Sequence, residues 1–73
     1  MLSFKIVESF GAPLIQSDCD DAGLMTLIEA LKRVPKAGHV HLRSPSCGGK
    51  ELSDITPFGQ SAVDEVVITF GDN

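Results

Sequence analysis

The sequence contains no Trp and no Tyr, and its four Phe are the only aromatic side chains among 73 residues. Surfaces that bind single-stranded nucleic acid use aromatic rings for base stacking, so this scarcity disfavours that class of partner. The chain also lacks an apolar run long enough to cross a bilayer, and its start lacks the basic and apolar regions of a signal peptide. We therefore expect a cytoplasmic protein that binds neither membrane nor nucleic acid.

Cysteine is scarce as well, since Cys19 and Cys47 are the only two. In the cytoplasm both thiols should stay reduced, which argues against a disulfide framework. A chain of 73 residues buries one modest core, with no room for a second domain, a Rossmann-type fold or a deep substrate cavity. We expect residues 1–73 to form a single domain without a cofactor, and such small domains often gain stability from a partner or a second copy.

Positive charge is absent from the last third of the chain. Residues 51–73 carry five acidic side chains and no Lys or Arg, whereas residues 24–50 carry five cations and one anion. The formal net charge is −4, so the chain will not bind nucleic acid through its overall charge. It could instead attract a basic protein, although solvated charges that keep a small protein soluble are the simpler interpretation.

The hydrophobic pattern changes period along the chain and predicts strands on both sides of one helix. Alternation predicts a strand over 2–8 and a short returning strand over 14–16. An apolar stripe at helical spacing, preceded by small acidic residues, predicts a helix over 20–34 that ends at Pro35 and Gly38. Alternation returns over 38–43 and 64–70, and the residues between them (44–62) show no sustained period. The stripe consists of Leu24, Leu27, Ile28, Leu31 and Val34.

The order β-β-α-β-β predicts an α+β fold with two layers. We expect the amphipathic helix to pack on one face of a small three- to four-stranded, mainly antiparallel sheet. The covered face would hold Leu2, Phe4, Ile6, Val40, Leu42, Val66, Ile68 and Phe70. The other face would be open to solvent or to another protein, and it would carry Lys5, Val7, His39, His41, Arg43, Val67 and Thr69.

His39 and His41 are expected on the same side of one strand, beside Arg43. Their bases would be about 7 Å apart, because a strand rises about 3.3 Å per residue. Two such imidazoles could share a zinc ion with Cys47, or serve in catalysis, but the HxH pattern alone fixes no further ligand. Nothing in the sequence indicates an oriented base and nucleophile in a pocket, so we expect no enzyme. Exposed or interface residues are the simpler interpretation of the pair.

Three segments carry a family resemblance: residues 39–46 (HVHLRSPS), 51–59 (ELSDITPFG) and 62–68 (AVDEVVI). Together with the helix from about Gly23 onwards, they resemble the small α+β immunity proteins that bacteria encode beside polymorphic or contact-dependent toxins. The resemblance covers about two-thirds of the chain, and it implies a cytoplasmic protein that binds and neutralises one cognate toxin without chemistry of its own. No functional residues are carried over from that family.

The fold argument supplies the candidate contact residues for such a toxin. An acidic domain with an open face suits a basic, nuclease-type toxin, because complementary charge speeds the encounter. The candidate partner-binding residues are His39, His41, Arg43, Glu51, Asp54, Asp64 and Glu65. A zinc-binding or catalytic protein that uses His39, His41 and Cys47 is the alternative, and a homodimer that pairs open faces or edge strands is a third.

Overall fold

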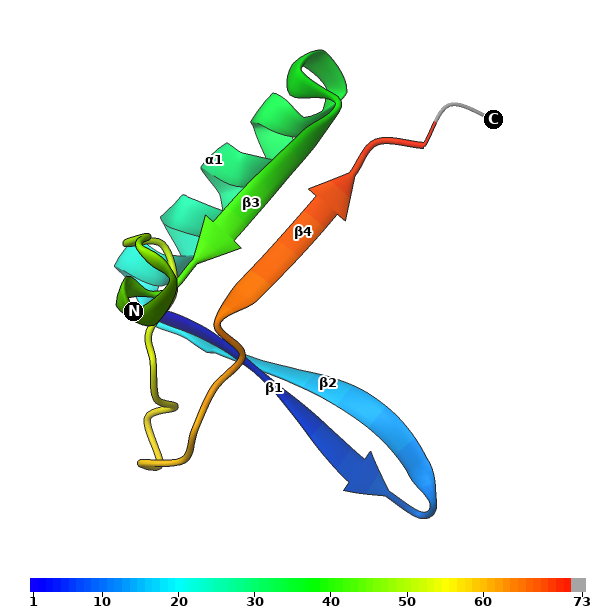
Figure 1. Ribbon diagram of the computed structural model, residues 1–73, viewed down its shortest axis with the longest axis vertical. Helices are drawn as coiled ribbons and strands as arrows, with labels where there is room; N and C mark the ends of the chain where they lie inside the picture. Colours follow the sequence, from blue (N-terminus) through cyan, green and yellow to red (C-terminus); the bar gives the residue numbers. More distant parts are fainter. Residues whose placement is uncertain (72–73) are drawn as a thin grey trace.

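The structure, a computed structural model, describes residues 1–71. Its elements run in the order β1 (Leu2–Ser9), β2 (Ala12–Cys19), α1 (Asp21–Ala37), β3 (His39–Arg43), a 3₁₀ turn (Pro45–Cys47) and β4 (Glu65–Thr69). The described residues form a small α+β fold with one α-helix and two separate two-stranded antiparallel sheets, β1–β2 and β3–β4 (Figure 1). The predicted α+β class is confirmed, whereas the predicted single sheet of three or four strands is not formed.

The hairpin β1–β2 is longer and tighter than the sequence pattern predicted. Phe10 and Gly11 alone form its turn, and both have a positive φ (51° and 78°). A two-residue turn needs such backbone angles to match the twist of the flanking strands. The second strand covers Ala12–Cys19 instead of residues 14–16. Pro13 does not break this strand. The pair of residues that flanks the turn is hydrogen-bonded, and Pro13 and Glu8 form the next pair, which is not. The Pro13 nitrogen therefore points to the free edge of the sheet, where no N–H is needed.

Helix α1 begins where the small polar residues predicted it would. The Asp20 side chain caps the first turn by accepting a hydrogen bond from the Gly23 N–H at 2.8 Å. Of the two residues predicted to end the helix, Gly38 does so and Pro35 does not. Pro35 lies in the last turn, where its missing N–H removes only one bond, and the helix ends at Gly38 with φ of 84°.

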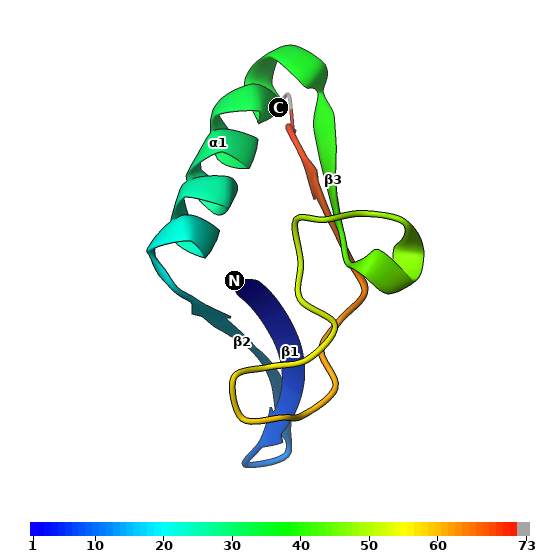
Figure 2. The ribbon, with the colours of Figure 1, turned by 90° about the vertical axis from the view of Figure 1, so that its left-hand side faces the viewer.

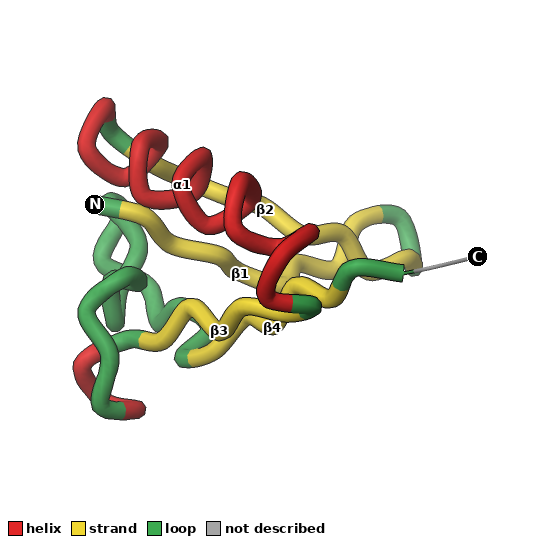
Figure 3. Tube along the Cα trace, turned by 90° about the horizontal axis from the view of Figure 1, so that it is seen from above, coloured by secondary structure: helices red, strands yellow, loops and turns green. Residues whose placement is uncertain are grey.

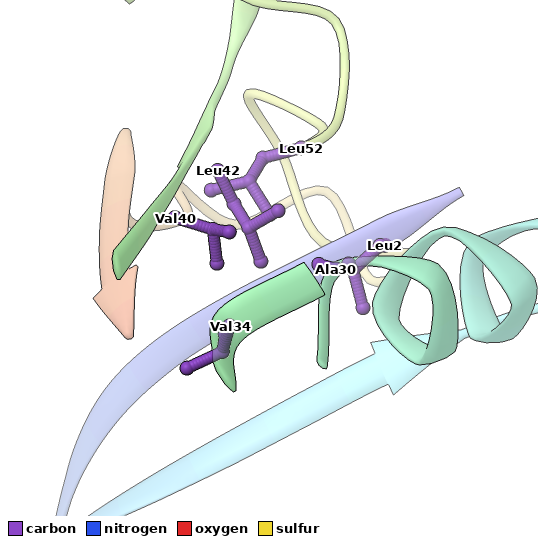
Figure 4. Packing of buried hydrophobic residues seen from close by; sticks show 6 residues of the cluster. All are labelled: Leu2, Ala30, Val34, Val40, Leu42 and Leu52. Carbon is purple, nitrogen blue, oxygen red and sulfur yellow. The ribbon is translucent and has the colours of Figure 1, made fainter. Parts of the chain in front are cut away.

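The core lies between α1, β3 and the first residues of β1. Figure 4 shows its six buried side chains, Leu2, Ala30, Val34, Val40, Leu42 and Leu52. The helix approaches through small residues, because a Cβ at Gly23 would stand only 1.6 Å from the Met1 carbonyl oxygen. This close approach rotates part of the predicted stripe outward, so Leu24 and Leu31 remain 45% and 49% exposed.

The β1–β2 and β3–β4 sheets remain separate because β1 and β4 diverge. The outer edge of β1 meets the segment before β4 at two points, where the Ser53 N–H bonds the Leu2 carbonyl and the Val63 N–H bonds the Phe4 carbonyl, each at 2.7 Å. The hairpin runs away from α1 and β3–β4 in Figure 2, and the view in Figure 3 shows α1 and β3–β4 as two layers. Ile6, predicted on the covered face, is therefore 65% exposed. Phe70, also predicted there, follows the end of β4 and is 52% exposed.

The other predicted members of the covered face are buried or partly buried: Leu2, Phe4, Val40, Leu42, Val66 and Ile68. The connection predicted without structure contains the 3₁₀ turn and an isolated bridge between Ile55 and Ser61. Among residues 1–71, no helix has the length and apolar character that crossing a membrane requires.

Candidate functional site

Strand β3 places three of the predicted contact residues on one exposed face. Val40 and Leu42 are buried in the core, while His39, His41 and Arg43 are exposed. This alternation follows from the period of a strand, in which successive side chains point to opposite faces. The structure thus brings together these three side chains as the sequence predicted.

A carboxylate from the neighbouring strand joins these residues. Glu65 lies opposite Arg43 in the register of β3 and β4. Its Oε2 accepts a hydrogen bond from Arg43 Nε at 2.5 Å and lies 3.2 Å from His41 Nδ1. The rings of His39 and His41 meet edge to face with centroids 5.1 Å apart. We call these four residues the outer-face cluster: His39, His41, Arg43 and Glu65.

The ionic state of the cluster is set by the contact between Arg43 and Glu65. The hydrogen bond from Arg43, then that from His41, holds the pKa of Glu65 below its ordinary value, and the same contact raises the pKa of Arg43. Both side chains remain accessible, 46% for Arg43 and 39% for Glu65, so solvent screens the ion pair. The cluster therefore stabilises the fold little and forms an oriented, charged part of the exposed surface.

The other predicted acidic contact residues form hydrogen bonds with the turn after β3. Glu51 Oε1 accepts a hydrogen bond from the Arg43 backbone N–H at 3.1 Å, and Asp64 Oδ1 accepts one from the Ser44 hydroxyl at 2.9 Å. Asp54 Oδ1 accepts a hydrogen bond from the Ser46 N–H at 3.3 Å, and hydrogen bonding to Ser46 holds the pKa of the Asp54 carboxyl below its ordinary value. These three acids fix the turn after β3, and only Glu65 joins the outer-face cluster.

The glycine pair after β3, Gly48 and Gly49, lies in a closely packed turn. The N–H groups of Cys47 and Gly49 both bond the Ser44 carbonyl at 2.9 Å, and Gly48 takes a φ of 80°. A Cβ on Gly49 would stand 2.4 Å from Arg43 Cβ and 2.5 Å from its carbonyl oxygen. The turn thus presses on the backbone of Arg43 and fixes it. Two successive glycines were the only sequence signal for this close approach.

The alternative zinc site is not assembled. Among residues 1–71, no three His, Cys, Asp or Glu side chains gather in an arrangement that could hold a metal ion. Cys47 does not join His39 and His41 as a third ligand, and His41 Nδ1 faces Glu65 and Arg43 instead. Cys19 and Cys47 are both free and exposed.

An apolar hollow lies beside the outer-face cluster, between the hairpin and the start of β4. It has a volume of about 270 Å³. We call it the wedge, and it is lined by Phe4, Ile6, Ile15, Val63, Glu65 and Val66. Glu65 belongs to both the wedge and the cluster, so an apolar surface and a charged surface meet at the first residue of β4. A second hollow of about 450 Å³ lies between α1 and the residues that follow Gly49.

Comparison with protein-family models, curated proteins and solved structures found no match to this chain.

Proposed function

We propose that this chain is a cytoplasmic immunity protein that binds one cognate bacterial toxin and neutralises it. The contact surface is the exposed face of β3–β4, centred on the outer-face cluster. The protein contributes no chemistry of its own in this proposal, because it acts by occupying a surface that the toxin needs. The resemblance of residues 39–46, 51–59 and 62–68 to small immunity proteins supports the same function.

The observation that carries the proposal is an Arg side chain held in place on an exposed face. The Gly49 turn packs against the backbone and Cβ of Arg43, and the Glu65 carboxylate bonds to the Arg43 guanidinium. This exposed ion pair stabilises the fold little. A side chain oriented in advance loses less conformational entropy when it binds, and Arg is enriched among residues that dominate binding energy. Such an arrangement favours recognition of another protein.

Charge indicates the kind of toxin. The described residues after Lys50 contain the acids Glu51, Asp54, Asp64 and Glu65 and no Lys or Arg. They border the cluster, because β4 and the turn after β3 both lie next to Arg43. A basic toxin, such as a nuclease with a cationic substrate-binding surface, complements this region and would associate rapidly at low salt.

A growth assay tests the proposal. The toxin-like gene adjacent to the coding sequence is expressed under an inducible promoter with wild-type protein, Arg43→Ala or Lys36→Ala. Each substitution removes one exposed cation, and Lys36 lies in the last turn of α1, outside the cluster. We expect wild type and Lys36→Ala to protect growth and Arg43→Ala to bind the toxin at least tenfold more weakly. Failure of the wild-type chain to protect against, or bind, the product of any adjacent gene contradicts the proposal.

A further inference from the structure

Strand β4 has one edge without a hydrogen-bonding partner. The Ser44 N–H bonds the Asp64 carbonyl and the Phe70 N–H bonds the Gly38 carbonyl, each at 2.9 Å. In an antiparallel pair, every second residue of a strand bonds to the neighbouring strand. Because Asp64 and Phe70 bond to the β3 side, the even-numbered residues of β4 are the ones that bond to β3. The N–H and C=O groups of Glu65, Val67 and Thr69 therefore point away from β3. In the described part of the chain, no other backbone group meets them.

The wedge lies beside the beginning of this edge. The Val63–Phe4 hydrogen bond joins β1 to the segment before β4, and from there the two strands diverge (Figure 1). The walls of the wedge are apolar except for Glu65. A strand placed along β4 would point alternate side chains to opposite faces. One set would reach the wedge, and the other would lie beside the outer-face cluster.

The other strand edges are less suited to a partner. At β3, the Arg43 N–H bonds Glu51 Oε1, and its carbonyl accepts bonds from the N–H groups of Glu51 and Leu52 at 3.1 Å. The first two outward carbonyls of β1 are bonded to Ser53 and Val63. At β2, Pro13 occupies an outward-facing position and offers no donor. Among the four strands, β4 keeps its outward groups open along its whole length.

We propose that the toxin docks by adding an extended strand of its own to the free edge of β4. This strand is apolar at the alternate positions that enter the wedge, and it carries Lys or Arg near Asp64 and Glu65. Backbone hydrogen bonds to the three outward residues supply affinity, and the wedge and the cluster supply specificity. The inference rests on the proposed immunity function and adds the recognition mode and the chemistry of the bound segment.

Charge favours a toxin strand over a second copy of this chain. Pairing two β4 edges would bring together two segments that each carry four described acids and no cation after Lys50. It would also rest on a strand of five residues, whereas stable interfaces bury about 800 Å² on each partner. A basic strand avoids this repulsion between acidic segments, and a larger protein can add contacts beyond the five-residue edge.

Proline scanning of the edges tests the inference with the purified product of the adjacent toxin gene as probe. Val67→Pro removes an outward N–H and no bond to β3, so the fold should persist. Ser17→Pro places the same change on the outer edge of β2 and is the matched control. We expect Val67→Pro to weaken toxin binding at least tenfold, and Ser17→Pro to stay within about twofold of wild type.

Amide hydrogen exchange of the wild-type complex supplies a readout that needs no variant. The N–H groups of Glu65, Val67 and Thr69 should exchange rapidly in the free protein and become protected in the complex. The inference is overturned if a folded Val67→Pro binds the toxin as wild type does and these amides stay unprotected in the wild-type complex. The proposed immunity function would then still stand. A wild-type dimer that Val67→Pro converts to a monomer with unchanged toxin affinity also overturns the inference, because the occupant is then a second copy. A wild-type chain that binds no toxin overturns both proposals.

Discussion

Replacing Gly49 with alanine should loosen the turn that fixes Arg43. The backbone of Gly49 is not in the left-handed region, so alanine meets no dihedral penalty there. Space is the obstacle, because the new Cβ would stand 2.4 Å from Arg43 Cβ and 2.5 Å from the Arg43 carbonyl oxygen. Both neighbours are part of, or next to, the backbone of β3, so the turn must move away from the strand.

The magnitude follows from what this movement breaks. Overpacking of this kind costs about 1–3 kcal/mol. The Arg43 carbonyl would also lose bonds from the N–H groups of Glu51 and Leu52, which contribute about 1 kcal/mol each. Against this, alanine restricts the unfolded chain and returns about 0.4–1 kcal/mol. We expect the free energy of unfolding to fall by about 2–4 kcal/mol, and the binding of the toxin to weaken because Arg43 is no longer fixed.

Urea unfolding followed by circular dichroism measures the stability change, with Gly48→Ala as the matched control. A Cβ at Gly48 meets nothing within 4 Å, but its φ of 80° is unfavourable for alanine, which costs about 1–2 kcal/mol. Gly48→Ala should therefore lose less stability and leave the contact between Arg43 and Glu65 in place. If Gly49→Ala is as stable as wild type or more stable, the turn does not press on Arg43 and the reasoning is wrong.

Two further predictions concern buried serines and the charged cluster. Ser3 and Ser44 are both fully buried, but Ser3 Oγ has no hydrogen-bond partner in the described residues, while Ser44 Oγ donates to Asp64. Ser3→Ala should therefore leave the free energy of unfolding unchanged or raise it by about 1 kcal/mol, and Ser44→Ala should lower it by about 1 kcal/mol. Urea unfolding measures both changes. Equal losses of stability in the two variants would contradict this prediction. The pKa of Glu65 is depressed by folding, so its contribution is present above its ordinary value of 4.5 and is lost as the pH falls through the folded value. Wild type should be slightly more stable than Glu65→Gln at neutral pH, and this difference should shrink as the pH falls below 4.5; a difference that grows on acidification would refute the ion pair.

Local patterns predicted the elements well because they depend on local chemistry. Alternation gave the exposed positions of His39, His41 and Arg43, and the cap at Asp20 gave the start of the helix. The turn at Phe10 and Gly11 was predicted too long, because a two-residue turn in which Phe takes a positive φ is not a strong sequence signal.

The tertiary arrangement depended on contacts that no period reveals. The division into two sheets arises where β1 and the segment before β4 diverge after the Val63–Phe4 bond. The rotation of the helix arises from small residues at Gly23 and Ala30, which let the helix approach closely and turn Leu24 outward. Similarly, the acids Glu51 and Asp54 had the charge of contact residues, but their hydrogen bonds commit them to the turn after β3.

Inhibition of the toxin in vitro tests the central claim most directly. The purified product of the adjacent toxin gene is assayed for its own activity while the wild-type chain is added in increasing amounts. We predict that activity falls to background at one chain per toxin, and that Arg43→Ala requires a much higher concentration while Lys36→Ala behaves as wild type. Full toxin activity in the presence of a stoichiometric excess of the wild-type chain would contradict the account.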